Sequence, residues 1–232
     1  MSASEDAAVR RNVLRSIAGV IFDLNGVLVE DEPLHEAAFA AALAPYGVTL
    51  TPALYRATIL GQTDAQGAAR VAAVTGVRLP IAHIVQAKER LYRERLSADG
   101  RRYVAPGARA LVMALAGRGL ARALASASPA VEVNTWLNIL DMTRQPFFFD
   151  PILTSESVYG PKPSPNVYEA IRQAWDIPAA ACAVIDDHPA NITIAASLGM
   201  RAIAIASTLP SSAFTGAFVT FSSLAELSAL LA

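Results

Sequence analysis

The chain has 232 residues, 53% of them hydrophobic and 17% charged, which is enough for a sizeable core in one large domain or a main domain with a smaller one. Nineteen basic against twenty acidic residues give a formal net charge of −1, which argues against nucleic acid as the main partner. A single cysteine, Cys182, excludes an internal disulfide. Because the sequence also offers neither a signal-peptide core nor a long apolar run, we expect a soluble, cytoplasmic protein without a membrane partner.

Residues 1–16 precede the first strand pattern, and they fit either an irregular tail or a short added helix. The first predicted strand is the apolar run Gly19–Phe22, and Asp23 follows it directly. Asn25 and Gly26 come next, and Asn-Gly between apolar runs is a strong hairpin signal because both residues tolerate a positive φ. The first interpretation of this stretch is therefore a strand followed by a turn.

The segment from about Leu34 to Arg102 shows no convincing strand pattern. Apolar residues recur there at helical spacing in four stretches, separated by prolines and glycines. The predicted helices are Leu34–Leu43, Pro52–Thr58, Asp64–Val74 and Ile81–Leu96. We therefore predict that residues 34–102 form a small all-helical domain inserted after the first strand.

The remainder of the chain alternates short apolar runs with segments of helical spacing. The predicted strands are Ala121–Ala125, Phe148–Leu153, Cys182–Ile185, Ala202–Ala206 and Phe218–Phe221. The predicted helices are Gly107–Ala116, Ala130–Leu140, Pro165–Trp175, Ala190–Leu198 and Leu224–Leu231. This alternation predicts an α/β fold in which residues 17–33 and 103–232 form a Rossmann-like parallel sheet core covered by helices on both faces.

Polar side chains follow four of the predicted strands. They are Asp23, the pair Ser126 and Ser128, Lys162, and the pair Asp186 and Asp187. Each has an ordinary structural explanation, since serines and aspartates often begin helices and a lysine between prolines is usually solvated. A parallel sheet, however, gathers the carboxyl ends of its strands at one edge, where ligands bind. This convergence favours a single functional site.

The residue types in that group suit phosphoryl transfer. Carboxylates from neighbouring strands can hold Mg²⁺, which accepts few protein carboxylates and keeps water and phosphate oxygens as its other ligands. The metal offsets the repulsion between a carboxylate and a phosphate, so that Asp23 can attack phosphorus as a nucleophile. Lys162 and Ser126, with neighbouring backbone N–H groups, would hold the other phosphoryl oxygens.

Four motifs in order, FDLNGVL, ALASAS, GPKPSPNVY and VIDDHPANITIAASLGM, resemble those of the haloacid dehalogenase (HAD)-like hydrolase superfamily. The helical insertion is similar to the cap domain of the beta-phosphoglucomutase and phosphoglycolate-phosphatase-like branch. This resemblance covers nearly everything from Gly19 to the C-terminus. It implies a phosphatase with Mg²⁺ as cofactor and a small phosphorylated metabolite as partner, in a monomer or a weak homodimer.

The resemblance also implies roles for individual residues of the core. Asp23 matches the nucleophile that becomes an aspartyl-phosphate, and Lys162 matches the lysine of the third motif. The second motif, Ser126 and Ala127, matches a phosphate-binding loop. The implied metal ligands are Asp23, the backbone carbonyl of Asn25, Asp187, and Asp186 either through water or as an acid beside the metal.

Two residues of the helical insertion match the branch less closely. His35 matches a group that faces the site from the cap hinge, and a surface histidine on a helix is an equal alternative. Thr63, in the stretch Gly61-Gln62-Thr63-Asp64, matches a substrate-specificity loop of the cap. Members of the branch often carry a basic residue there, and its absence leaves the substrate open.

Asn25 is the main departure from the resembled family, whose phosphatases have a second aspartate at this position. That aspartate protonates the leaving oxygen and later deprotonates the attacking water. A carboxamide forms hydrogen bonds but exchanges no proton near neutral pH. General acid–base catalysis typically contributes about 10²–10⁴-fold, so we predict turnover impaired by roughly that factor. A natural attenuation and an introduced substitution both fit the sequence.

Three alternative functions fit the same motifs. The first is a catalytically silent protein that binds a phosphorylated ligand. The second is a phosphosugar mutase, which also requires an acid and base at position 25. The third is a 2-haloacid dehalogenase, which lacks the second aspartate but needs no Mg²⁺, whereas Asp186 and Asp187 suit a metal ion.

Overall fold

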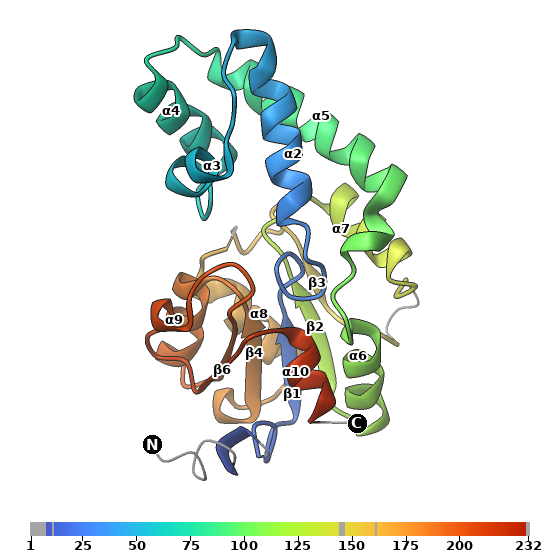
Figure 1. Cartoon of the computed structure of the whole chain (residues 1–232). Helices are drawn as coiled ribbons and strands as arrows, with labels where there is room; N and C mark the ends of the chain where they lie inside the picture. The colour runs from blue at the N-terminus through green and yellow to red at the C-terminus, as the bar shows by residue number, and fades with distance from the viewer. Residues whose placement is uncertain (1–7, 11, 144–146, 161, 231–232) are drawn as a thin grey trace. The chain divides into compact units, whose positions relative to one another are not determined.

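The computed structural model describes residues 8–10, 12–143, 147–160 and 162–230. The chain divides into two compact units (Figure 1). The α/β unit contains the described residues up to Glu30 and from Tyr103 onward, and the helical unit is Asp31–Arg102. Residues 1–7 and 11 of the predicted extension, and Leu231 of the last predicted helix, lie outside the described residues.

The α/β unit is built on a six-stranded sheet in the order β3-β2-β1-β4-β5-β6, in which every pairing is parallel. Its strands are β1 (Gly19–Phe22), β2 (Ala121–Ala125), β3 (Ile152–Leu153), β4 (Cys182–Asp186), β5 (Arg201–Ile205) and β6 (Val219–Phe221). The predicted α/β fold with a parallel sheet is confirmed. Because β1 is entirely buried between β2 and β4, its apolar sequence is accounted for by burial on both faces.

Helices cover both faces of this sheet (Figure 1). They are α6 (Ala108–Gly117), α7 (Ala130–Ile139), α8 (Pro165–Trp175), α9 (Pro189–Ser197) and α10 (Leu224–Ala229), with short 3₁₀ turns at Ala179–Ala181 and Ser211–Ala213. Helix α8 packs on β1 and β2, and α9 packs on β4 and β5. Helix α6 packs on β2, and α10 packs on α6 and β6. Alternate strand residues therefore point into two separate apolar layers.

The predicted strand Phe148–Leu153 is wrong in extent, because only Ile152–Leu153 form β3. The side chain of Arg122 donates hydrogen bonds to the carbonyl oxygens of Phe147 and Phe148, so these acceptors are taken by a side chain. Pro151 has no N–H group to donate to a neighbouring strand. Backbone hydrogen bonds to β2 are still present at Asp150 and Pro151, but these residues do not form part of the regular strand.

The helical unit contains α2 (Glu32–Leu43), α3 (Pro52–Thr58), α4 (Asp64–Thr75) and α5 (Ile81–Asp99), with 3₁₀ turns at Ala44–Tyr46 and, at its boundary, Gly100–Tyr103. Helix α2 packs along α5, and α4 contacts both α3 and α5. Phe39, Leu43, Val71 and Ile84 lie in its buried apolar core. Of the helices in the described parts of the chain, none combines the length and the apolar character needed to cross a membrane.

The described part of the N-terminal segment packs against the α/β unit. Val13 is buried, and the guanidinium of Arg201 donates hydrogen bonds to the carbonyl oxygens of Val13 and Arg15. Arg10 forms an ion pair with Glu226 of α10 and lies over the ring of Phe221. Residues 8–10 and 12–16 are therefore tied to the strands and helix at the C-terminal end of the chain.

Candidate active site

The register of the sheet brings the ends of β1, β2 and β4 to the same level. Phe22, the last residue of β1, pairs with Leu124 of β2 and with Ile185 of β4. The next residue on each strand therefore lies at the same edge, and these residues are Asp23, Ala125 and Asp186. The backbone N–H of Asp23 donates to the carbonyl oxygen of Ile185 at 2.9 Å, which continues the pairing past the end of β1.

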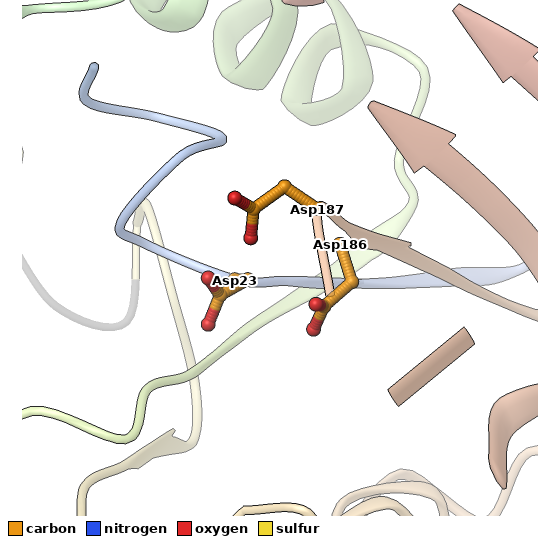
Figure 2. Close-up of side chains that lie close together, drawn as sticks. All are labelled: Asp23, Asp186 and Asp187. Atoms are coloured by element: carbon orange, nitrogen blue, oxygen red, sulfur yellow. The ribbon is translucent and has the colours of Figure 1, made fainter. Parts of the chain in front are cut away.

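Three carboxylates meet at this edge of the sheet. One oxygen from each of Asp23, Asp186 and Asp187 lies within 4.8 Å of the other two (Figure 2). Asp23 comes from the end of β1 and the other two come from the end of β4, as Figure 2 shows. Asp23 and Asp186 are buried, whereas Asp187 is partly exposed. Like charges at this separation repel, so the group requires positive charge.

Lys162 supplies part of that charge from the loop between β3 and α8. Its ammonium donates to Asp23 Oδ1 at 2.7 Å, to Asp186 Oδ2 at 2.6 Å and to the carbonyl oxygen of Ala125 at 3.0 Å. The loop is fixed on the helix side because the hydroxyl of Ser164 accepts from the N–H of Asn166, as an N-cap. Lys162 thus binds the ends of β1, β2 and β4 together.

Burial and mutual charge set the ionisation of this cluster. Burial is the main cause that raises the pKa of Asp23, Lys162 acts in the opposite direction, Asp186 adds to the increase, and the net result is a pKa of about 7. Burial disfavours the Lys162 ammonium, but Asp186 and Asp23 outweigh it and hold the pKa of Lys162 well above its usual value. The ammonium is therefore charged at neutral pH, and a further cation beside Asp23 would favour its ionised, nucleophilic form.

Asp186 is held on both oxygens, which its position in the sequence does not reveal. Its Oδ2 accepts from Lys162, and its Oδ1 accepts from the backbone N–H of His188 at 2.9 Å and from Asn191 Nδ2 at 3.0 Å. Asn191 lies five residues later, in the first turns of α9. Asn191 was not among the predicted site residues, although a polar residue at a buried position of a helix is a recognisable signal.

The loop after β1 requires a glycine next to Asp187. Gly26 has φ +74°, and a Cβ added there would lie 1.9 Å from Asp187 Oδ2. The N–H of Gly26 donates to the carbonyl oxygen of Val29 at 2.7 Å, and its carbonyl oxygen accepts from Ser207 Oγ at 3.0 Å. The Asn-Gly turn is therefore present, and it also makes room for a carboxylate of the cluster.

Asn25 contacts the serine motif that follows β2. Ser128 Oγ donates to Asn25 Oδ1 at 2.9 Å, and the N–H of Ser128 donates to Ser126 Oγ at 3.1 Å. Ser126 is buried and Ala127 is exposed. The structure thus places Asn25, Ser126 and Ser128 together at the strand ends. The contact of Ser128 with Asn25 was not foreseen because it depends on how two loops, 103 residues apart, are folded.

The residues present fit a divalent cation. Three carboxylates against one ammonium leave the cluster with negative charge in excess, and oxygen ligands of this type are those that hard divalent cations prefer. Two of the carboxylates are already fixed by Lys162 and Asn191, which limits the rearrangement needed on binding.

The other two predicted site residues lie in the helical unit. His35 Nε2 lies 3.2 Å from Asp31 Oδ2, and its ring stacks on Tyr92 with the centroids 4.3 Å apart. The hydroxyl of Thr63 accepts from the N–H of Gln66, and the Gln66 side chain accepts from the N–H of Thr63, which is a capping box at the start of α4. Within the helical unit, both side chains are thus engaged in local structure.

Comparison with known proteins identifies relatives with the same fold as this chain and a family to which the chain belongs. The chain is 29% identical over 198 residues to the protein SUPPRESSOR OF QUENCHING 1, chloroplastic, of Arabidopsis thaliana, covering 83% of the chain but spanning only 18% of the relative. It is 27% identical to Hexitol phosphatase B of Escherichia coli (strain K12), over 93% of the chain and 96% of the relative. The crystal structure of CbbY from Rhodobacter sphaeroides in complex with phosphate superposes with a TM-score of 0.72 at 25% identity, covering 91% of this chain and 96% of that one. The model of the haloacid dehalogenase-like hydrolases matches residues 17–199, and the chain belongs to this hydrolase family.

Proposed function

We propose that the protein is a Mg²⁺-dependent phosphatase of a small sugar- or metabolite-phosphate, with Asp23 as nucleophile and with turnover attenuated at Asn25. The observation that carries this proposal is the buried arrangement of Asp23, Lys162 and Asp186 beside Asp187, at the strand ends of a HAD-like hydrolase. Hexitol Phosphatase B, named as a phosphatase, and CbbY, crystallised with phosphate, support a phosphorylated substrate.

In this proposal Asp23, Asp186, Asp187 and the backbone carbonyl of Asn25 hold Mg²⁺. When bound, the ion would supply the positive charge that allows an anionic phosphoryl group to approach the carboxylates. Lys162 fixes the Asp23 carboxylate through its hydrogen bond to Oδ1 and offsets charge on the phosphoryl oxygens. Ser126 and the backbone N–H of Ala127 bind those oxygens from the β2 side.

Catalysis then proceeds by transfer of the phosphoryl group to Asp23. The carboxylate attacks phosphorus, the bond to the substrate oxygen breaks, and water later cleaves the aspartyl-phosphate. Proton transfer to the leaving oxygen and from the attacking water is the part that Asn25 cannot perform. We further propose that the helical unit serves as a cap that selects the substrate, with His35 and Thr63 as candidate contacts.

The direct test is the variant Asn25→Asp, assayed with Mg²⁺ against phosphates of hexitols, hexoses and pentoses. We expect turnover to rise by about 10²–10⁴-fold on at least one substrate, because general acid–base catalysis is restored. Asn25→Asp/Asp23→Asn is the matched control and should be inactive. If neither the unaltered chain nor Asn25→Asp hydrolyses any phosphate ester while both bind inorganic phosphate, the protein is a silent binder and the phosphatase proposal fails.

A further inference from the structure

Asn25 is expected to affect the formation and the hydrolysis of an aspartyl-phosphate on Asp23 to different extents. Its side chain lies at the strand-end site, held by the hydroxyl of Ser128 at 2.9 Å. Asp23, two residues earlier, keeps its place in the charged cluster through the 2.7 Å hydrogen bond from Lys162. The nucleophile and its supporting cation are therefore in place, and the group two residues on is a neutral amide that exchanges no proton.

Formation of an aspartyl-phosphate needs a proton only when the leaving group is a strong base. A sugar phosphate must expel an alkoxide, which requires protonation. An acyl phosphate expels a carboxylate, the anion of an acid with a pKa of about 4, which is stable without a proton at neutral pH. Acyl phosphates therefore avoid the step for which Asn25 is unsuited.

Hydrolysis of the aspartyl-phosphate, unlike its formation from an acyl phosphate, requires a proton transfer. Water must give up a proton as it attacks phosphorus, and this deprotonation normally depends on a general base. Asn25 accepts a hydrogen bond from Ser128 but removes no proton from water.

We propose that the protein, with Asn25 in place, accepts on Asp23 a phosphoryl group donated by an acyl phosphate. It then retains this group as a long-lived phosphoprotein. This proposal rests on the assignment of Asp23 as the nucleophile in the proposed function. In the step, an oxygen of the Asp23 carboxylate forms a bond to phosphorus. The bond between phosphorus and the acyl oxygen breaks, and the carboxylate leaves with the bonding electron pair, so no proton, oxidant or reductant is required.

The phosphorylated form keeps a balanced interior, which favours its persistence. Once Asp23 carries the phosphoryl group as a mixed anhydride, Lys162 can still pair with Asp186, from which it lies 2.6 Å in the present structure, and Asp186 can keep its hydrogen bonds from His188 and Asn191. The charge of the former carboxylate is then carried by the phosphoryl oxygens, and the buried pair of Lys162 and Asp186 remains balanced.

The test is intact-protein mass spectrometry after incubation of the full chain with acetyl phosphate and Mg²⁺. We expect an added mass of one phosphoryl group on most molecules, which persists after the donor is removed. Asp23→Asn should acquire none. In Asn25→Asp the adduct should decay about 10²–10⁴-fold faster, because the introduced carboxylate activates water.

The following results would overturn the proposal. Continuous consumption of acetyl phosphate without an adduct would show that another side chain, such as His188, activates water at this site. An adduct of equal size in Asp23→Asn would place phosphorylation elsewhere. If Asn25→Asp hydrolyses sugar phosphates while the unaltered chain forms no adduct, the proposed function stands and this inference fails. If both tests are negative, both proposals fail.

Discussion

The two units of the molecule differ in how each neutralises a buried lysine. The chain contains only two lysines, Lys88 and Lys162, and both are buried. In the helical unit Lys88 Nζ donates to both oxygens of Asp64, at 2.8 and 3.0 Å, and lies 5.3 Å from the ring centroids of Phe39 and Tyr92. In the α/β unit Lys162 is shared between Asp23 and Asp186, with Asp187 beside them.

This difference distinguishes a charge-balanced ion pair from a cluster with an excess of carboxylates. Lys88 and Asp64 form a one-to-one pair whose charges cancel, so that pair by itself calls for no further ion. The Lys162 cluster has three carboxylates for one ammonium and keeps negative charge that a bound cation can offset. An excess of charge in a buried cluster costs stability, and such clusters are typical of functional sites.

Replacing each lysine by methionine should reveal the largest difference between the two environments, as a difference in the free energy of unfolding. Lys162→Met leaves Asp23 and Asp186 buried without their cation, and removing one partner of a buried pair typically costs about 3–5 kcal/mol. Lys88→Met should cost less, about 1–3 kcal/mol, because the Asp64 side chain is 31% exposed and can be hydrated while methionine keeps the packing on Phe39.

Urea denaturation, with and without Mg²⁺, measures this contrast. We expect Mg²⁺ to restore part of the stability lost in Lys162→Met, because the ion replaces positive charge among the carboxylates. Mg²⁺ should stabilise Lys88→Met only as much as it stabilises the unaltered chain, so the difference in stability between these two should stay the same. Equal recovery in both variants, or a larger loss in Lys88→Met, would contradict the distinction between the two clusters.

The hydrogen bond between Ser128 and residue 25 predicts a smaller effect, on turnover, than the lysine substitutions have on stability. In the Asn25→Asp background a hydroxyl that donates to the new carboxylate should hold it in place, and a hydrogen bond to a charged group is worth about 1.5–3 kcal/mol. Ser128→Ala should therefore lower kcat of Asn25→Asp by about tenfold or more. In the unaltered chain the same substitution should change the already low turnover much less, and steady-state kinetics on both backgrounds compares the two.

The sequence predicted the parts of the fold that depend on local patterns. Strands Gly19–Phe22 and Ala121–Ala125 have their predicted bounds because each is a short, mainly apolar run between turn residues, entirely buried in β1 and buried over Ala123–Ala125 in β2. Helix α5 extends to Asp99, past its predicted end at Leu96. The apolar pattern predicted the earlier end because Ser97–Asp99 are exposed or partly exposed and add nothing to the apolar period. Helix α2 begins at Glu32 and not at Leu34, since proline is accommodated in the first turn.

The site was predictable where it depends on strand order and not where it depends on side-chain contacts. A parallel sheet brings Asp23 and Asp186 together whatever the details of their neighbours. The support of Asp186 by Asn191, the hydrogen bond of Ser128 with Asn25 and the pairing of Lys88 with Asp64 depend on the packing of particular loops and helices. No spacing rule in the sequence specifies those contacts.

The most direct measurement is thermal unfolding of the unaltered chain, Asp187→Asn and Asp64→Asn as Mg²⁺ is raised. If the excess carboxylates of the α/β unit hold the ion, the unaltered chain and Asp64→Asn should gain about 2.7 kcal/mol at a Mg²⁺ concentration 100 times Kd. Asp187→Asn should gain much less at the same concentration. An unchanged Tm in the unaltered chain, or the same increase in Asp187→Asn, would contradict a cation site at the ends of β1 and β4.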